Sequence, residues 1–142
     1  MRPGFRMTIG DEPGGVARAA AAFAGFAEAH ALPDAVRRSL QIALDELLRN
    51  AVAYGSPGPA GGEVTVEVAL DPDRVTATVT DNGRPFDPFG VAAPDTTLGV
   101  EERRIGGLGI HLVREMMDEV SYQRRGDRNV VTLVKSLAEG SP

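Results

Sequence analysis

The chain has 142 residues, which is enough for one domain with its own core. Its 15 Lys and Arg against 20 Asp and Glu give a net charge of -5 without a basic run, which argues against direct contact with nucleic acid. It has no cysteine, which excludes disulfides and thiolate metal sites. Neither a signal-peptide core nor an apolar stretch of membrane-spanning length is present, so we expect a cytoplasmic protein without a membrane partner.

Five segments are predicted as β-strands, either because apolar and polar residues alternate or because they are short and rich in strand formers. They are residues 5–9, 63–70, 75–80, 120–125 and 128–135. The first is expected at an edge of the sheet. The second and third form a hairpin, and the last two form another that turns at Gly126 and Asp127.

Three helices are predicted between these strands. An alanine-rich helix covers residues 16–30, and the next begins near Pro33, which suits a first helical turn, and ends at Gly55. The third helix opens after a glycine cluster. Its expected core stripe is Leu108, Leu112, Met116 and Val120, widened by Val113 and Met117. The element order predicts an α/β (α+β) two-layer sandwich, with a mixed, mostly antiparallel sheet and the helices on one face.

The helix that ends at Gly55 carries two rows of side chains. Its core face recurs at helical spacing: Leu40, Leu44, Leu47 and Ala51. A polar row beside it has one residue every four, Glu46, Asn50 and Tyr54. A carboxylate one turn from a carboxamide suits a site that holds a metal ion and polarises a hydroxyl, and the same row also fits a partly exposed helix edge.

Asp81 points toward the core because it continues the alternation of three apolar residues, Val75, Ala77 and Val79. A carboxylate there costs several kcal/mol unless it is well paired. The same residue is also suited to opening a turn with Asn82 and Gly83. From the sequence alone both interpretations stay open.

The segment before the last helix has the composition of a binding loop. Residues 84–104 show little periodicity, and a structureless loop of this length is often a lid. The cluster Gly106-Gly107-Leu108-Gly109 then opens the helix, where backbone N–H groups and the helix dipole favour an anion. Such a cluster is a weak signal by itself. His111 lies off the expected core stripe and is interpreted as a surface residue.

Three separate elements can therefore face one anionic ligand, and together they form a recognisable pattern. In this order, the segments LDELLRNAVAYG, VTDNGRPFDP and GGLGIHLVREMMDEVSY resemble the N box and the two glycine boxes of the GHKL (Bergerat) ATPases. More narrowly, they resemble the stand-alone anti-sigma factor serine kinases of the RsbW type. The resemblance covers roughly residues 5–136, expected to be one histidine-kinase-like ATPase domain, with a flexible tail at 137–142.

The resemblance implies a role for each matching residue. Glu46 would be the general base on a substrate serine hydroxyl, and Asn50 would ligate Mg²⁺ at the phosphates of ATP. Asp81 would accept a hydrogen bond from the adenine amino group, and Gly83 would let the backbone approach the base. The other residues implied to bind the nucleotide are Tyr54, Gly106, Gly107, Leu108 and Gly109.

The sequence departs from the wider superfamily at three places. Pro85 stands where another glycine often follows the first glycine box, as in a variant common among these kinases. Tyr54 occupies a place often held by histidine. Asn129 and Val130 fall where a threonine is often found near the start of the last strand, so the water network behind adenine is not predicted by the resemblance.

The resemblance implies a serine/threonine kinase that phosphorylates an anti-anti-sigma (STAS-domain) protein and sequesters a sigma factor or another regulator, acting as a homodimer. Arg18 aligns with an arginine that a sporulation kinase of the family uses toward its partners, and Arg103 or Arg104 has the charge and position to reach the γ-phosphate. The alternative is a nucleotide-dependent binding module without phosphotransfer, and intact Glu46 favours the kinase. A histidine kinase or a DNA-topology ATPase would need further domains, for which 142 residues leave no room.

Overall fold

The computed structural model describes residues 2–10, 14–54, 62–90 and 108–137. Within them the chain forms three α-helices, five strands and one short 3₁₀ helix. In chain order these are β1 Gly4–Ile9, α1 Gly15–Ala29, α2 Asp34–Tyr54, β2 Val64–Leu70, β3 Arg74–Asp81, η1 Pro88–Gly90, α3 Leu108–Met116, β4 Glu119–Arg125 and β5 Arg128–Ser136. No helix in these ranges is long and apolar enough to cross a membrane.

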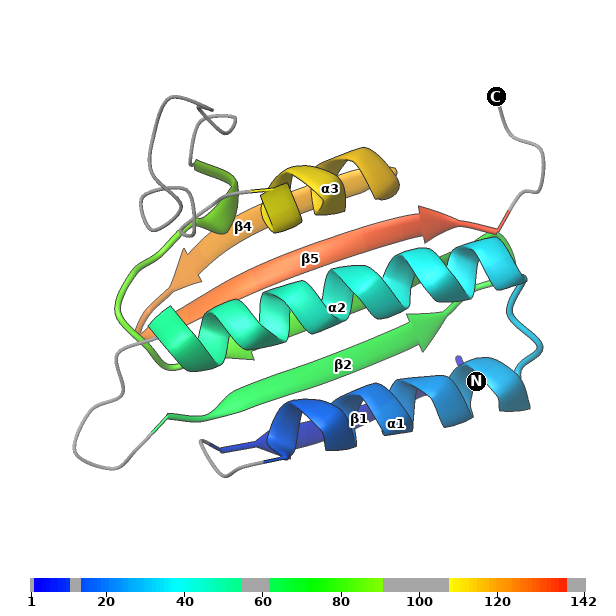
Figure 1. Cartoon of the computed structure of the whole chain (residues 1–142), viewed down its shortest axis with the longest axis horizontal. Helices are drawn as coiled ribbons and strands as arrows, with labels where there is room; N and C mark the ends of the chain where they lie inside the picture. The colour runs from blue at the N-terminus through cyan, green and yellow to red at the C-terminus, as the bar shows by residue number, and fades with distance from the viewer. Residues whose placement is uncertain (1, 11–13, 55–61, 91–107, 138–142) are drawn as a thin grey trace.

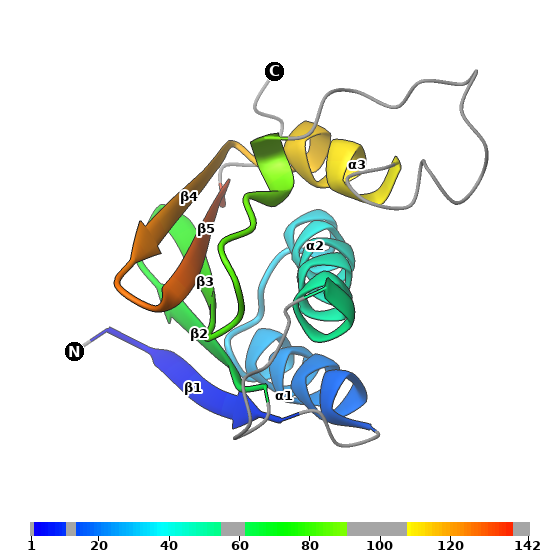
Figure 2. The same cartoon turned by 90° about the vertical axis from the view of Figure 1, so that its left-hand side faces the viewer.

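The strands form one sheet in the order β1-β2-β3-β5-β4, and each neighbouring pair is antiparallel. All three helices cover the same face of this sheet, with α1 over β1 and α2 over its middle (Figures 1 and 2). The predicted two-layer sandwich and mostly antiparallel sheet are confirmed. The strand over residues 5–9 is an edge strand, as expected, because β1 pairs only with β2 among the described strands.

The core lies between the sheet and α2. Leu40, Leu44 and Leu47 are buried, and Ala51 is partly buried against the same cluster, which confirms the predicted core face of this helix. The opposing side chains come from alternate residues of the central strands, among them Val66, Val75, Ala77 and Val79. This alternation leaves the threonines of β3 on the other face of the sheet, away from the helices.

The predicted core stripe of the last helix is wrong. Ile110, Val113 and Met117 are the buried residues, whereas the Leu112 side chain is 50% exposed. The helix ends at Met116, so Val120 belongs to β4 instead. Both sets of residues have helical spacing, and the face that meets α2 is decided by a tertiary contact at Gly109, described below.

The expected tail begins with a residue that is bonded to the sheet. The Leu137 N–H donates to the Asp73 carbonyl oxygen at 3.0 Å, and residues 138–142 lie outside the described residues.

Candidate functional site

The three predicted elements meet at one end of the sheet. The last turns of α2, the segment that follows β3 and the first turn of α3 all lie at this end, which faces the viewer in Figure 2. A hydrogen bond from Arg114 of α3 to the Phe89 carbonyl oxygen, at 3.2 Å, also ties the segment after β3 to α3. The sequence order therefore brings the acid–amide pair, the inward aspartate and the glycine-rich helix start to one region.

Glu46 lies directly against Gly109. A Cβ atom built on Gly109 would clash with the carboxyl group of Glu46, closer than side chains approach in real proteins. Glycine is therefore required at this position, since any larger residue would displace the half-buried carboxylate or separate α2 from α3. This close approach accounts for one glycine of the cluster independently of any phosphate, and the sequence alone gave no sign of it.

Asp81 satisfies both interpretations of its sequence. It continues the buried face of β3 and is half-buried, as the alternation predicted. Its Oδ1 also accepts a hydrogen bond from the Gly83 N–H at 2.9 Å, which is the side-chain-to-backbone bond of a turn-opening aspartate. A second bond reaches the same oxygen from Asn129 Nδ2, also at 2.9 Å. Gly83 itself is buried, so its lack of a side chain suits a close approach of the backbone to a ligand.

Asn129 is the site residue that the sequence analysis missed. It is only 2% exposed and is the Cα partner of Asp81 in the antiparallel pairing of β3 and β5. Its Nδ2 donates to Asp81 and, at 2.8 Å, to the Arg84 carbonyl oxygen. Its position in the alternation with the buried Val131 and Leu133 is the signal that could have found it, because a polar residue there must face inward.

The carboxamide oxygen of Asn129 collects three donors. They are the Phe86 N–H at 3.2 Å, the Tyr122 hydroxyl at 2.5 Å and the Arg124 Nη1 at 3.2 Å. The same Arg124 nitrogen donates to the Gly83 carbonyl oxygen at 2.8 Å. The turn after β3 is thus attached to β4 and β5 through side chains as well as through the sheet.

The remaining predicted residues are placed as follows. Asn50 is half-buried on α2, one turn after Glu46. Tyr54 closes α2 and Leu108 opens α3, but their side chains lie outside what the structure describes. Gly106, Gly107, Arg103 and Arg104 are also outside the described residues.

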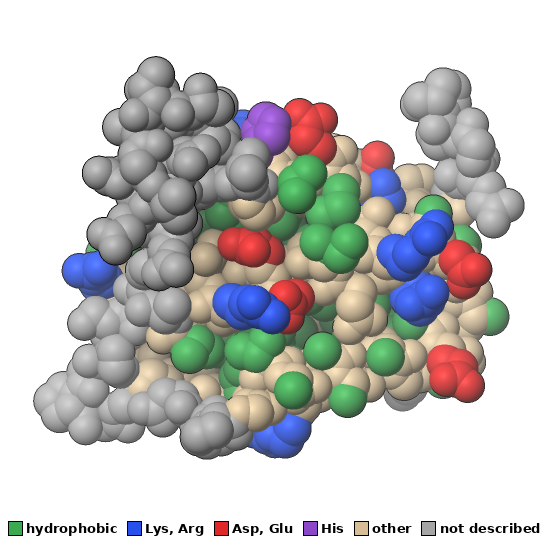
Figure 3. Space-filling view, in the orientation of Figure 1, with side chains coloured by type: hydrophobic (Ala, Val, Ile, Leu, Met, Phe, Trp, Pro, Cys, Tyr) green, Lys and Arg blue, Asp and Glu red, His purple; other side chains and the backbone are tan. Residues whose placement is uncertain are grey.

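The surface next to the predicted base is charged and apolar by turns. Asp45 and Arg49 form the predicted i,i+4 ion pair, with 3.0 Å between Oδ2 and Nε. His111 is exposed, as expected, and lies 3.5 Å from the Glu115 carboxylate. Figure 3 shows acidic and basic side chains interspersed with hydrophobic ones on this helical face.

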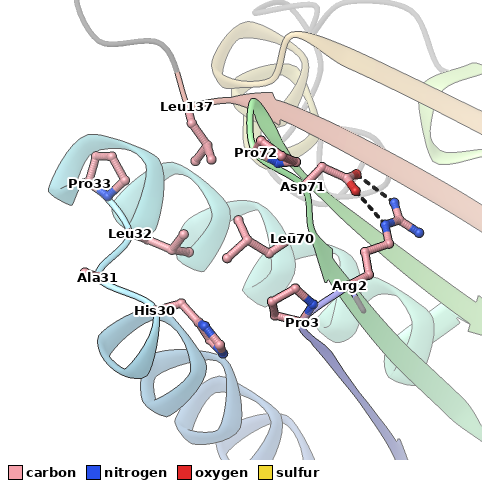
Figure 4. Close-up of a pocket in the computed structure, with 10 residues that line it drawn as sticks. All are labelled: Arg2, Pro3, His30, Ala31, Leu32, Pro33, Leu70, Asp71, Pro72 and Leu137. Carbon is pink, nitrogen blue, oxygen red and sulfur yellow. Dashed lines mark hydrogen bonds and ion pairs between the residues drawn. The ribbon is translucent and has the colours of Figure 1, made fainter.

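A cavity of about 550 Å³ lies at the opposite end of the sheet (Figure 4). Leu32, Leu70 and Leu137 point into it, and none of the described residues that line it belongs to the predicted site. At its rim the Arg2 guanidinium makes a two-pronged ion pair with Asp71, at 2.7 and 2.8 Å. The hydrogen bond from Arg2 holds the pKa of the Asp71 carboxyl below its usual value.

Comparison with known proteins agrees with this geometry. The sequence matches the protein family described as histidine kinase-like ATPase domain over residues 9–135. The chain belongs to this family. Membership implies that the polar end of the sheet serves an ATP-using domain. In the described part of the chain, no three His, Asp or Glu side chains gather as a metal cluster.

Named relatives of the chain are protein kinases. It is 36% identical over 98 residues to serine-protein kinase RsbW of Listeria monocytogenes, a match that covers 66% of this chain and 62% of that protein. It is 32% identical over 108 residues to serine/threonine-protein kinase BtrW of Bordetella bronchiseptica, covering 75% of each. The match to the Listeria RsbW therefore spans less than two thirds of that relative's length.

A solved structure shares the fold of the family. The crystal structure of the RsbU and RsbW domains of Rv1364c from Mycobacterium tuberculosis superposes with a TM-score of 0.69 at 17% identity, covering 94% of this chain and 32% of that chain. At this identity the likeness shows the fold alone.

Proposed function

We propose that this protein is an ATP-dependent serine/threonine protein kinase of the anti-sigma factor type. Its substrate would be an anti-anti-sigma (STAS-domain) protein in a partner-switching pathway. The observation that carries the proposal is the contact between Glu46 and the start of α3, at the same end of the sheet as Asp81. The kinase names of the RsbW and BtrW relatives support the same reaction.

Glu46 is the proposed general base. It would take the proton from a substrate hydroxyl while that oxygen bonds to the γ-phosphorus and ADP leaves with the electrons of the broken P–O bond. Its contact with Gly109 fixes the carboxylate between α2 and α3 before any substrate arrives. Such positioning accounts for most of the catalysis that phosphoryl transfer requires of a protein.

Asn50 is the proposed protein ligand of Mg²⁺. A carboxamide oxygen suits a hard cation, and Mg²⁺ at phosphates takes only one or two protein ligands, so the donors present fit this metal without a cluster of acids. When bound, the cation neutralises charge on the phosphates. Asn50 lies one turn from Glu46, so the metal ligand and the base are on one row of α2.

The proposed nucleotide contacts extend from β3 to α3. Asp81 would accept from the adenine amino group, and the buried Gly83 would let the base approach the backbone. The backbone at Gly106, Gly107, Leu108 and Gly109 would contact the phosphates, with Tyr54 near the nucleotide.

Two half-exposed hydrophobic residues favour a protein as the phosphate acceptor. Ile42 is 51% exposed and lies one helical turn before Glu46 on the same row of α2. Leu112 is 50% exposed and follows Gly109 by three residues on α3. Because Gly109 contacts Glu46, these side chains flank the proposed base, where a docked protein would remove them from water. A sigma factor or another regulator, and a second copy of this chain, are the further proposed partners.

The test is phosphate transfer by Glu46→Gln. The purified protein, Mg²⁺, γ-labelled ATP and the STAS protein encoded nearby should give label on a serine or threonine of that protein. Glu46→Gln should abolish the label and keep ATP binding measured by calorimetry. Asp45→Asn is the matched control, because it removes the neighbouring carboxylate, which pairs with Arg49, and should leave transfer intact.

The outcomes separate the proposal from its alternative. Transfer by Glu46→Gln at the native rate would refute the assigned base. ATP-dependent capture of the STAS protein without label in the native protein would favour the binding module that transfers no phosphate.

A further inference from the structure

The side chain of Asn129 has one possible orientation. Its oxygen faces three donors, from Phe86, Tyr122 and Arg124, and its NH₂ group faces two acceptors, on Asp81 and Arg84. Turning the amide over would put N–H groups against donors and oxygen against acceptors. A buried polar group that satisfies its partners in this way is held rigidly.

This rigidity is passed to the Asp81 carboxylate. Both of its described hydrogen bonds, from Asn129 Nδ2 and from the Gly83 N–H, end on Oδ1 at 2.9 Å. Two donors on one oxygen fix the plane of the carboxylate and turn Oδ2 toward the other side. The Gly83 end of this arrangement is itself held by Arg124, which donates to the Gly83 carbonyl oxygen.

We propose that Asn129 is a positioning residue that sets the preference of the site for purines with a 6-amino group, by fixing the Asp81 carboxylate that accepts from it. This inference rests on the proposed function, since it takes ATP as the ligand. Asparagine is suited to the task because it supplies two N–H donors and an acceptor from one buried position. Threonine would supply a single hydroxyl hydrogen, and aspartate would set a second carboxylate against Asp81.

The experiment compares two nucleotides on three proteins. Calorimetry would give the Kd of ATP and of purine riboside 5′-triphosphate, which lacks the 6-amino group, for the native protein, Asn129→Thr and Tyr122→Phe. We expect the native protein to prefer ATP. Asn129→Thr should bind ATP about tenfold more weakly and the analogue nearly as before, so that the preference is lost. Tyr122→Phe, the matched control, removes one donor to Asn129 but leaves its bond to Asp81, and should keep the preference.

Equal weakening of both nucleotides by Asn129→Thr, with the preference kept, would overturn the proposal, because a purely structural residue would behave in that way. A native protein that binds neither nucleotide would overturn the proposed function as well, so the two failures are distinguishable. If Asn129→Thr does not fold, amide NMR of the native protein decides the question. The Asn129 NH₂ resonances should move with ATP and not with the analogue, and equal movement with both would overturn the proposal.

Discussion

The two ends of the sheet differ in what they bury. One end encloses polar groups, the half-buried Asp81 and the fully buried Asn129, joined by hydrogen bonds. The other surrounds its cavity with leucine and proline side chains and leaves its ion pair of Arg2 and Asp71 at the rim. Burying polar groups costs free energy of folding even when they are bonded, whereas burying leucine contributes to it. The difference indicates that the first end is shaped by ligand binding and the second by stability.

The sharpest way to break this comparison is to add one methyl group at the polar end. Gly109→Ala would place a Cβ against the Glu46 carboxyl group. We expect phosphate transfer to fall roughly 100-fold, because displacing a catalytic group by about 1 Å has effects of that size. The measurement is the rate of label transfer from γ-labelled ATP.

Gly25→Ala is the matched control for that substitution. A Cβ at Gly25, on α1, would meet nothing within 4 Å. It should leave transfer unchanged and raise the stability by about 0.5–1 kcal/mol, since alanine is the better helix former. Native transfer rates in Gly109→Ala would contradict the role given to the contact.

The cavity end should respond in stability and not in binding. Leu32 is 8% exposed and lines the cavity, so Leu32→Ala removes buried methyl groups. We expect a loss of about 2 kcal/mol, at the lower end for such changes because the site is already open on one side. Urea unfolding measures the loss, and the Kd of ATP should stay within twofold of the native value. A large loss of ATP affinity would show that the two ends are coupled.

The smallest expected effect concerns the ion pair at the cavity rim. Arg2→Ala removes the hydrogen bond that lowers the pKa of Asp71. A lowered carboxyl pKa stabilises the fold above the pKa of the unfolded chain, and this contribution is lost as the pH falls through the folded value. Arg2→Ala should therefore lower Tm by roughly 2 °C or less at pH 7, and the difference should vanish below about pH 3. Thermal melts at both pH values check this, and a difference that grows in acid would contradict it.

Sequence periodicity was sufficient for the sheet and for the direction of Asp81, because alternation decides which face of a strand is buried. It failed on α3, where two sets of apolar residues have helical spacing and only the contact of Gly109 with Glu46 shows which faces α2. It also missed Asn129, whose partners come from three separate segments that meet only in the folded chain. Pairwise patterns along a sequence carry no information on such networks.

The order of the strands has a consequence for the behaviour of the protein at high concentration. The outer strands β1 and β4 are short, and an outer strand can recruit further strands and seed aggregates. β1 carries Arg6 in its middle, and β4 ends in Arg124 and Arg125. Positive charge on both rims makes stacking of copies rim to rim unfavourable, which helps the chain remain dispersed while its helical face is free to meet a partner.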